Sequence, residues 1–282
     1  CCLVGSVLRE MRPSLREGNY GQALIAGTAE IGERIAESKG VTLDRTLPRR
    51  DAPRNTDGGG FPIGGLVREC TVFVPSSYAG KPTPAVLGFH AGLTSGEFFE
   101  RQTQFSRLAE RQGVLVAYPE GTGHWQTWNA GHCCGWAQME DVDDVGFVAR
   151  LLDELAARYN VAQFFATGFS NGACLCHRLG CEIPSRFAAI AVVSGSMWER
   201  LTPPQSLPVF ITHGLADQNI PWAGGVGRVA MQKINHQAGQ ETVDKWEAAQ
   251  SRVLLVLHHW GHVWLPGTTE SVWDFFSKQP AI

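Results

Sequence analysis

Apolar and polar positions follow two different periods along the chain, and each period predicts a different kind of element. Continuous apolar runs that end in glycine occupy residues 85–92 and 113–121, and an alternating run occupies residues 68–75. Continuous apolar runs of this length are typical of strands buried on both faces of a parallel sheet. The alternating run predicts a strand that is buried on one face only.

Helical spacing appears between further apolar runs in the second half of the chain. Residues 142–160 combine apolar positions at helical spacing with an acidic first turn, which the helix dipole favours. We expect strands at residues 164–169, 188–195, 207–214 and 252–259, helices at 171–182 and 268–279, and a helix between the last two strands. This alternation predicts an α/β fold with a doubly wound, mostly parallel sheet and helices on both faces.

The first quarter of the chain lacks this alternation. Residues 20–38 space apolar groups by three and four positions, which predicts an amphipathic helix. Residues 48–65 are rich in Pro, Gly, Asp and Arg without periodicity, which indicates a linker or long loop. We therefore expect an N-terminal helical extension and linker at residues 1–64, and one catalytic domain at residues 65–282.

Composition narrows the classes of partner. The 282 residues carry a formal net charge of −3, with Lys and Arg scattered along the chain, so nucleic acid is not an expected partner. No run reaches the roughly 18 apolar residues that a membrane span requires. The sequence starts with Cys1 rather than Met and leaves the compartment open between export, the cell envelope and the cytoplasm.

A candidate nucleophile lies between a predicted strand and a predicted helix. Residues 168–172, GFSNG, match the pattern G-x-S-x-G in that context. The pattern places Ser170 on a sharp turn, where side chains at the two flanking glycine positions would collide. The alternative is a polar residue in a glycine-rich connection, but the neighbouring strand and helix favour the nucleophile.

A serine nucleophile requires a base and a carboxylate that orients the base. Asp217 follows the end of a predicted strand, and His262 lies in the loop after the last strand. The order Ser, Asp, His along the chain is that of an α/β-hydrolase triad. We interpret the competing side chains as packing or helix-start residues, namely His90, His213, His258, His259, Asp143 and Asp144.

The negative oxygen of a tetrahedral intermediate requires two preorganised N–H donors. We expect the amide of Asn171 to be one donor, because it follows the serine directly. The second should come from the loop at residues 88–96, where Gly92 is favoured and Leu93 is the alternative.

Aromatic residues suggest a binding surface near this site. We expect Trp128 and Trp222, together with Trp125 and Leu93, to line the substrate pocket, although buried packing remains an equal alternative for each Trp.

The eight cysteines are too few for a disulfide scaffold. One hypothesis is a bridge that joins the pair Cys133 and Cys134 to one of the helical residues Cys174, Cys176 and Cys181. A zinc site is disfavoured because no CxxC pair recurs and no His lies at ligand spacing beside these cysteines. We expect neither a metal nor another cofactor.

In its ordered motifs, the chain resembles the polyhydroxybutyrate depolymerase and feruloyl esterase group of α/β-hydrolases. The resemblance runs from about Cys70 to Trp264 and includes HAGLTSGEFF, WNAGHCCGWA, GFSNGA, HGLADQNIPWAGG and WGHVW. It implies a triad of Ser170, Asp217 and His262, the three residues that the chain order also favours. Two motifs depart from the group: Ala91 replaces the glycine of a usual His-Gly pair, and the GGGHxWP pattern appears as WGHVWL. Because of the first departure, the resemblance does not identify which residue of the loop supplies the second oxyanion donor.

The sequence thus predicts a serine carboxylic ester hydrolase that forms an acyl-enzyme without a cofactor. Its expected partner is a small, oligomeric or polymeric ester with an aryl (feruloyl-type) or short hydroxyalkanoate acyl group. Polyester depolymerisation and acyl transfer on the same scaffold remain alternatives, as does polymer binding by an inactive hydrolase.

Overall fold

A computed structural model describes residue 13 and residues 56–63, 66–229 and 233–280. The chain divides into two compact units, Cys1–Pro53 and Arg54–Ile282. The helix predicted at residues 20–38 and the first part of the predicted linker lie outside the described residues. The second unit is described below.

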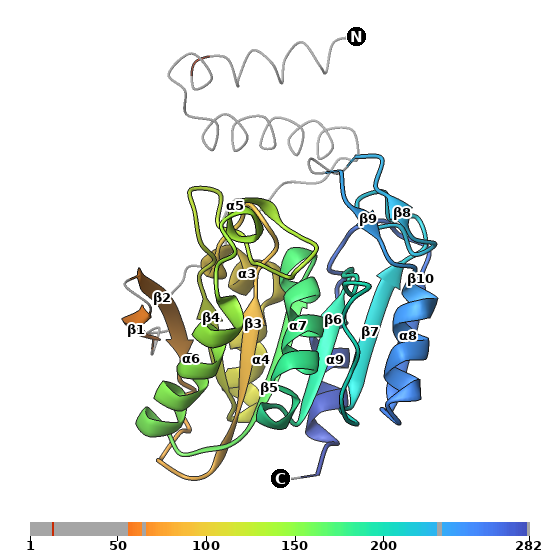
Figure 1. Ribbon diagram of the computed structural model, residues 1–282. Helices are drawn as coiled ribbons and strands as arrows, with labels where there is room; N and C mark the ends of the chain where they lie inside the picture. The colour runs from red at the N-terminus through yellow and green to blue at the C-terminus, as the bar shows by residue number, and fades with distance from the viewer. Residues whose placement is uncertain (1–12, 14–55, 64–65, 230–232, 281–282) are drawn as a thin grey trace, which may run out of the picture. The chain divides into compact units, whose positions relative to one another are not determined.

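An eight-stranded sheet forms the centre of this unit, with the strand order β1-β2-β4-β3-β5-β6-β7-β10 (Figure 1). The strands are β1 (Thr56–Ile63), β2 (Leu66–Phe73), β3 (Thr83–Phe89), β4 (Leu115–Pro119), β5 (Val161–Phe169), β6 (Ala189–Val193), β7 (Val209–Gly214) and β10 (Val253–His258). Strands β1 and β2 pair antiparallel, as do β2 and β4, and every other pairing is parallel. The mostly parallel sheet of the sequence prediction is confirmed.

Helices cover both faces of the sheet. They are α3 (Gly96–Thr103), α4 (Phe105–Gln112), α5 (Gly135–Met139), α6 (Asp144–Arg158), α7 (Asn171–Glu182), α8 (Gly239–Ala248) and α9 (Thr268–Ser277), with a 3₁₀ turn η1 (Pro184–Arg186). Helices α6, α7 and α8 pack on one face, and α3, α4 and α9 pack on the other. A short ribbon of β8 (Gly225–Val226) and β9 (Asn235–His236) follows β7.

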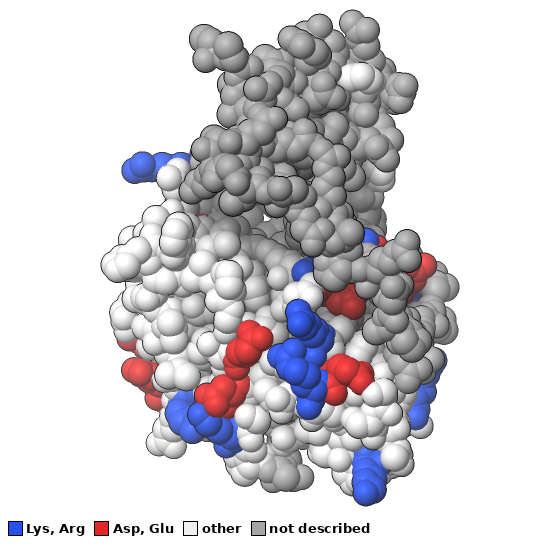
Figure 2. Space-filling view, turned by 180° about the vertical axis from the view of Figure 1, so that it is seen from behind, with Lys and Arg blue, Asp and Glu red and all other residues white. Residues whose placement is uncertain are grey.

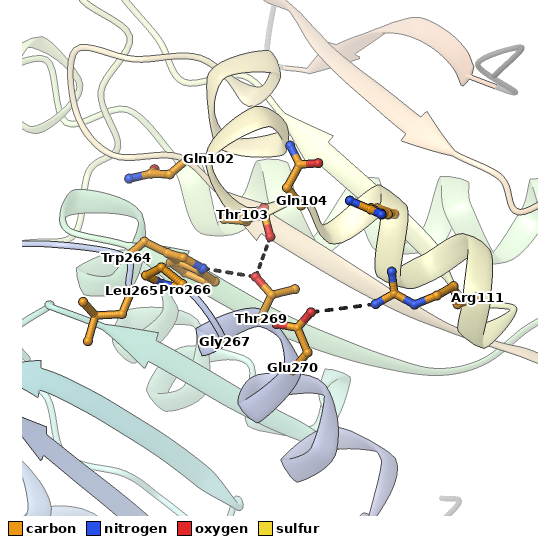
Figure 3. A pocket seen from close by; sticks show the side chains of 11 residues that line it. Gln102, Thr103, Gln104, Arg111, Trp264, Leu265, Pro266, Gly267, Thr269 and Glu270 are labelled. Atoms are coloured by element: carbon orange, nitrogen blue, oxygen red, sulfur yellow. Dashed lines mark hydrogen bonds and ion pairs between the residues drawn. The ribbon is translucent and has the colours of Figure 1, made fainter. Parts of the chain in front are cut away.

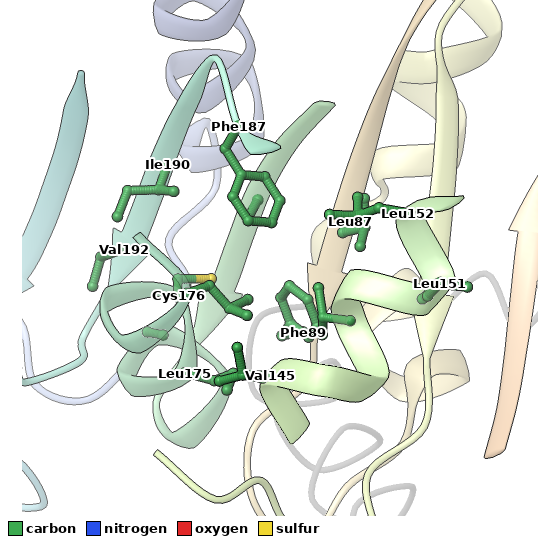
Figure 4. Packing of buried hydrophobic residues seen from close by; sticks show 14 of the residues in the cluster. Leu87, Phe89, Val145, Leu151, Leu152, Leu175, Cys176, Phe187, Ile190 and Val192 are labelled. Atoms are coloured by element: carbon green, nitrogen blue, oxygen red, sulfur yellow. The ribbon is translucent and has the colours of Figure 1, made fainter. Parts of the chain in front are cut away.

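Two apolar clusters hold these layers together, one on each face. Side chains along β6 alternate between them: Ile190 and Val192 belong to the first cluster, and Ala191 and Val193 belong to the second. Figure 4 shows part of the first cluster, where side chains of β3 and β6 meet those of α6 and α7. Burial on both faces explains why these strands are continuous apolar runs in the sequence.

The prediction of a linker at residues 48–65 is wrong for residues 56–63, which form a strand. Residues Thr56–Ile63 form β1, which pairs with β2 along its whole length, so the sheet begins before the predicted boundary at residue 65. Pairing of the backbone with a neighbouring strand needs no apolar pattern, and the run Gly58–Gly60 supplies none. The sequence therefore carried no strand signal here.

Charged side chains lie in groups of mixed sign on the face that Figure 2 shows. Arg101 pairs with Glu97, and Lys278 pairs with Asp274. In the described part of the chain, no helix is both long and apolar enough to cross a bilayer.

Candidate active site

Ser170 occupies a strained turn between β5 and α7. Its backbone angles are φ 57° and ψ −118°, a conformation that costs a non-glycine residue about 1–3 kcal/mol. A Cβ atom on Gly168 would overlap the backbone of Gly172, and a Cβ atom on Gly172 would overlap the carbonyl of Phe89. The two glycines therefore allow β5, α7 and the end of β3 to approach closely, which holds Ser170 at the carboxyl edge of the sheet.

Asp217 and His262 meet at the same edge. Asp217 follows β7 and His262 follows β10, and these strands are parallel neighbours, so their carboxyl ends lie together. The Nδ1 atom of His262 lies 2.7 Å from Oδ2 of Asp217. Because a carboxylate accepts, Nδ1 carries the proton, and Nε2 of the neutral ring is left to accept one.

The surroundings of Asp217 favour its ionised form. The amides of Asn219 and Ile220 donate to Oδ1 at 2.8 and 2.9 Å. Burial by itself raises the pKa of Asp217, but the hydrogen bond and charge of His262 and the Ile220 amide outweigh it and hold the pKa below its ordinary value. Asp217 therefore stays negative at neutral pH and can orient the imidazole.

The loop that carries His262 is fixed on both sides. The ring of His262 lies on that of Phe169, the residue before Ser170, with 4.9 Å between the centroids. Figure 3 shows the other anchor, where Nε1 of Trp264 donates to Oγ1 of Thr269 at 3.1 Å. The Thr269 hydroxyl in turn donates to the carbonyl of Thr103 at 2.6 Å. These contacts tie the loop to α3, α9 and the turn before Ser170.

Ser170 and His262 line one cavity of about 460 Å³. Gly92, Leu93 and Asn171 also line it, so five of the predicted site residues share this space. Its remaining wall is largely apolar and includes Ile220, Val229, Ile234 and Cys134. The volume lies within the range of about 300–1,000 Å³ that is usual for small-molecule sites.

The two residues predicted as oxyanion donors, Asn171 and Gly92, line the same cavity as Ser170. The amide of Asn171 is the first of α7, and the first amides of a helix have no acceptor within it. A Cβ atom on Gly92 would lie 3.5 Å from the Asn171 side chain, so Gly92 faces that side chain. The amide of Leu93 instead donates to the Gln126 carbonyl at 3.1 Å. The geometry therefore favours Gly92 over Leu93 as the second donor, while Leu93 lines the cavity with its side chain.

The side chain of Asn171 has a role that sequence reasoning missed. Its Oδ1 accepts from the amide of Trp128 at 2.8 Å, and its Nδ2 donates to the carbonyl of Trp128 at 2.9 Å. This double hydrogen bond fastens the loop before α5 to the start of α7. The loop is held a second time by Asp144, which accepts from the Asn129 amide at 2.7 Å and pairs with buried Arg68 at 2.9 Å.

The predicted aromatic wall is wrong for two of its tryptophans. Trp128 is 0% exposed and donates through Nε1 to the carbonyl of His90 at 3.0 Å, so it braces the loop from inside. Trp222 packs on His213, with 5.4 Å between ring centroids, and does not line the cavity. Trp125 is 63% exposed and lines a separate shallow pocket that shares Leu93 with the cavity. Sequence position near the site did not reveal which way these rings point.

Two of the histidines that we interpreted as structural, His90 and His213, have partners inside the fold. His90 is buried, and its Nε2 accepts from the Gly121 amide at 2.9 Å while its Nδ1 contacts the Ala91 carbonyl at 2.7 Å. Burial lowers the pKa of His90 to about 4, so the ring is neutral. His213 lies 2.8 Å from the carbonyl of Ile220 through Nε2. Asp143 caps α6 by accepting from the Gly146 amide.

The hypothesis of a bridge between the two cysteine groups is wrong. The disulfide joins Cys133 to its neighbour Cys134, and Cys174 is a free buried thiol. Cys176 and Cys181 are also free, because helical spacing directs both into the apolar cluster between α7 and the sheet. Possible metal-ligand atoms of His132, Cys133 and Cys174 lie within 4.8 Å of one another, but the Cys133 sulfur is already bonded and is not a thiolate.

Peptide mapping tests this pairing. Among the described cysteines, reduction should make two further thiols available for alkylation, both on the peptide that contains residues 133–134, because the bond joins neighbours. In a Cys133→Ser variant, Cys134 should be alkylated without reduction. A cross-linked peptide that joins residues 133–134 to α7 would contradict the assignment.

Comparison with known proteins shows that the chain is similar to esterases. Residues 69–206 match the family model described as Esterase PHB depolymerase. The chain is 26% identical over 191 residues to feruloyl esterase B of Piromyces equi, covering 64% of this chain and 35% of that protein. It is 27% identical over 148 residues to a poly(3-hydroxyoctanoate) depolymerase of Pseudomonas fluorescens, covering 48% and 52%. The chain thus spans about a third to a half of the length of these relatives.

A solved structure supports the fold. An acetyl xylan esterase from Aspergillus awamori superimposes with a TM-score of 0.58 at 15% identity, covering 79% of this chain and 98% of that one. Identity at this level speaks for the arrangement of strands and helices and not for the substrate.

Proposed function

Because residues 69–206 match the family model described as Esterase PHB depolymerase and the sheet has the α/β-hydrolase fold, we propose that the protein is a serine carboxylic ester hydrolase. Ser170 is the nucleophile, His262 the base and Asp217 the acid of its triad. The observation that carries this proposal is the 2.7 Å contact between His262 and Asp217 beside a cavity that His262 shares with the strained Ser170.

The reaction proceeds in two stages. His262 Nε2 takes the proton of Ser170 while Oγ attacks the ester carbonyl, and then passes that proton to the departing alkoxide. The Asn171 and Gly92 amides stabilise the negative oxygen of the tetrahedral intermediate. A water molecule, activated by the same imidazole, then attacks the acyl-enzyme and releases the acid and free Ser170. Asp217 stays ionised and holds the ring in the required tautomer throughout.

The cavity supports soluble or oligomeric esters as substrates. Its wall of Ile220, Val229 and Ile234 suits an apolar acyl group, and its volume of about 460 Å³ suits an aryl or short hydroxyalkanoate acyl chain. By their names, one of the relatives described above acts on feruloyl esters and another on poly(3-hydroxyoctanoate), a hydroxyalkanoate polyester.

A hydrolysis panel tests the proposal. We expect turnover of short-chain p-nitrophenyl esters and of methyl ferulate or hydroxybutyrate dimers, and slower release of acid from a solid polyester film, because the cavity encloses the acyl group. Acid release measured by titration at constant pH would give kcat/KM for each ester. Failure of the folded protein to hydrolyse any soluble ester would contradict the proposed function, and faster release from the film would contradict the proposed substrate class.

A further inference from the structure

Three polar side chains form a hydrogen-bonded row that ends at the cavity. His132 Nε2 lies 3.0 Å from Ser196 Oγ, and Ser196 Oγ lies 2.7 Å from His236 Nδ1. Ser196 and His236 are buried, and the ring of His236 lines the cavity together with Ser170 and His262. The mechanism proposed above uses none of the three.

His132, at the end of the row away from the cavity, determines which ring nitrogens of the row carry protons. His132 Nδ1 faces the carbonyl of Ala130 at 3.4 Å, and a carbonyl can only accept, so Nδ1 carries the proton. Burial lowers the pKa of His132, and burial followed by the charge of His132 lowers the pKa of His236 to about 4. Both rings are therefore neutral near pH 7, and each carries a single N–H. Nε2 of His132 is consequently an acceptor.

The remaining protons follow from this starting point. Ser196 gives its only proton to Nε2 of His132, so its oxygen accepts from Nδ1 of His236. The Ser196 amide is engaged separately, by the sulfur of Cys174 at 3.3 Å. The one N–H of His236 is thus used, and its Nε2 is an acceptor without a hydrogen bond to any described residue.

The charged and titratable groups near His236 are consistent with a neutral ring. Asp217 raises its pKa, whereas His132, His262 and His213 lower it, and burial dominates. The adjoining cavity wall is apolar at Ile220 and Ile234. An acceptor beside these apolar side chains gains a hydrogen bond when a ligand brings a hydroxyl donor.

The residues that line the cavity differ in exposure. His236 is 5% and Ile220 6% exposed, whereas Leu93 and Val229 are 47% and 61% exposed. The alcohol part of an oligomeric ester must continue into solvent, but the acyl group ends within the pocket. The buried part of the cavity, to which His236 belongs, therefore suits the acyl group.

We propose that His236 determines acyl specificity by accepting a hydrogen bond from a hydroxyl group on the acyl chain. This inference rests on the proposed esterase function. Both the phenolic hydroxyl of a hydroxycinnamoyl group and the hydroxyl of a hydroxyalkanoyl group can donate to Nε2. Comparison of substrates from the two classes shows which acyl group the cavity accepts.

Matched esters test the donor requirement. One series consists of the methyl esters of 4-hydroxycinnamate, 4-methoxycinnamate and cinnamate, and the other compares 3-hydroxybutyrate with butyrate. In the series whose acyl group fits the cavity, kcat/KM for the hydroxylated ester should exceed kcat/KM for the esters without the hydroxyl group by about 5-fold. A factor of this size is usual for one hydrogen bond between neutral groups. The methoxy ester matters because it accepts but cannot donate.

Variants test whether the preference for hydroxylated esters depends on the row formed by His132, Ser196 and His236. In His236→Leu, the ratio of kcat/KM between hydroxylated and unhydroxylated esters should fall to about one, whatever the overall rate. In Ser196→Ala, which removes the partner that fixes the ring's tautomer, the preference for hydroxyl over methoxy should shrink. The exposed His259 offers a matched control, and His259→Leu should retain the wild-type ratio.

Each outcome decides the inference. A wild-type ratio that persists in His236→Leu, or in Ser196→Ala if the first variant does not fold, would overturn it. Equal preference of the wild type for the methoxy and hydroxyl esters would also overturn it, because Nε2 would then be a donor. Turnover of these esters without a preference for the hydroxyl group would reject only the role of His236. Absence of turnover on every ester would reject the proposed esterase function as well.

Discussion

Replacement of Ser170 by alanine is expected to lower kcat for a p-nitrophenyl ester by about 10⁶-fold, the typical effect of removing a triad nucleophile. The variant loses the oxygen that forms the acyl-enzyme, while the Asn171 and Gly92 amides remain in place. Residual hydrolysis should therefore be slow and should show no burst of p-nitrophenol. Stopped-flow and steady-state release of p-nitrophenol measure both properties.

Ser194 offers a matched control for this substitution. It also has a positive φ, 51°, and its buried hydroxyl has no hydrogen-bond partner among the described residues. Ser194→Ala makes the same chemical change on a comparably strained backbone, so it should fold and keep nearly wild-type turnover. Equal activity of the Ser170→Ala and Ser194→Ala variants would contradict a nucleophilic role for Ser170.

Replacement of Asp217 by asparagine should lower kcat by about 10⁴-fold, because an amide cannot hold the imidazole in the required tautomer. Oδ2 now accepts from Nδ1 of His262, while Oδ1 accepts the amides of Asn219 and Ile220. In the variant, Oδ1 keeps its two amides and Nδ2 faces the ring as a donor. His262 must then present an unprotonated Nδ1 to it, which leaves the proton on Nε2, where the serine proton should go.

Asp143→Asn is the matched control for the carboxylate. Asp143 caps α6, and asparagine caps helices about as well as aspartate, so this variant loses a charge without losing the cap. It should retain wild-type kcat. Measurement of kcat for both variants on the same ester separates a triad role from a general effect of charge, and a loss of less than 10-fold in Asp217→Asn would contradict the assignment.

Much of the fold could be predicted because its signals are local. Strands β3, β6 and β7 are buried on both faces and therefore appear as continuous apolar runs. The turn at Ser170 was equally visible, because its two flanking glycines are required sterically. The order of Ser170, Asp217 and His262 then indicated which strand ends had to meet.

The parts that could not be predicted depend on contacts between distant segments. Strand β1 exists because β2 pairs with it, and its glycines carry no pattern. Trp128 is buried because Asn171 holds its backbone from another element, which nothing in the local sequence reveals. The row from His132 to His236 joins residues about a hundred positions apart through Ser196, so only the folded chain assembles it.

The central claim is that Ser170, activated by His262 and Asp217, is the reactive group of this protein. Its most direct test is reaction with a fluorophosphonate, which phosphonylates an activated serine, followed by mass spectrometry of the digested protein. We expect one adduct per chain, on the peptide that contains Ser170, and a loss of labelling in His262→Ala. An adduct on another residue, or no adduct on the folded wild-type protein, would contradict the claim.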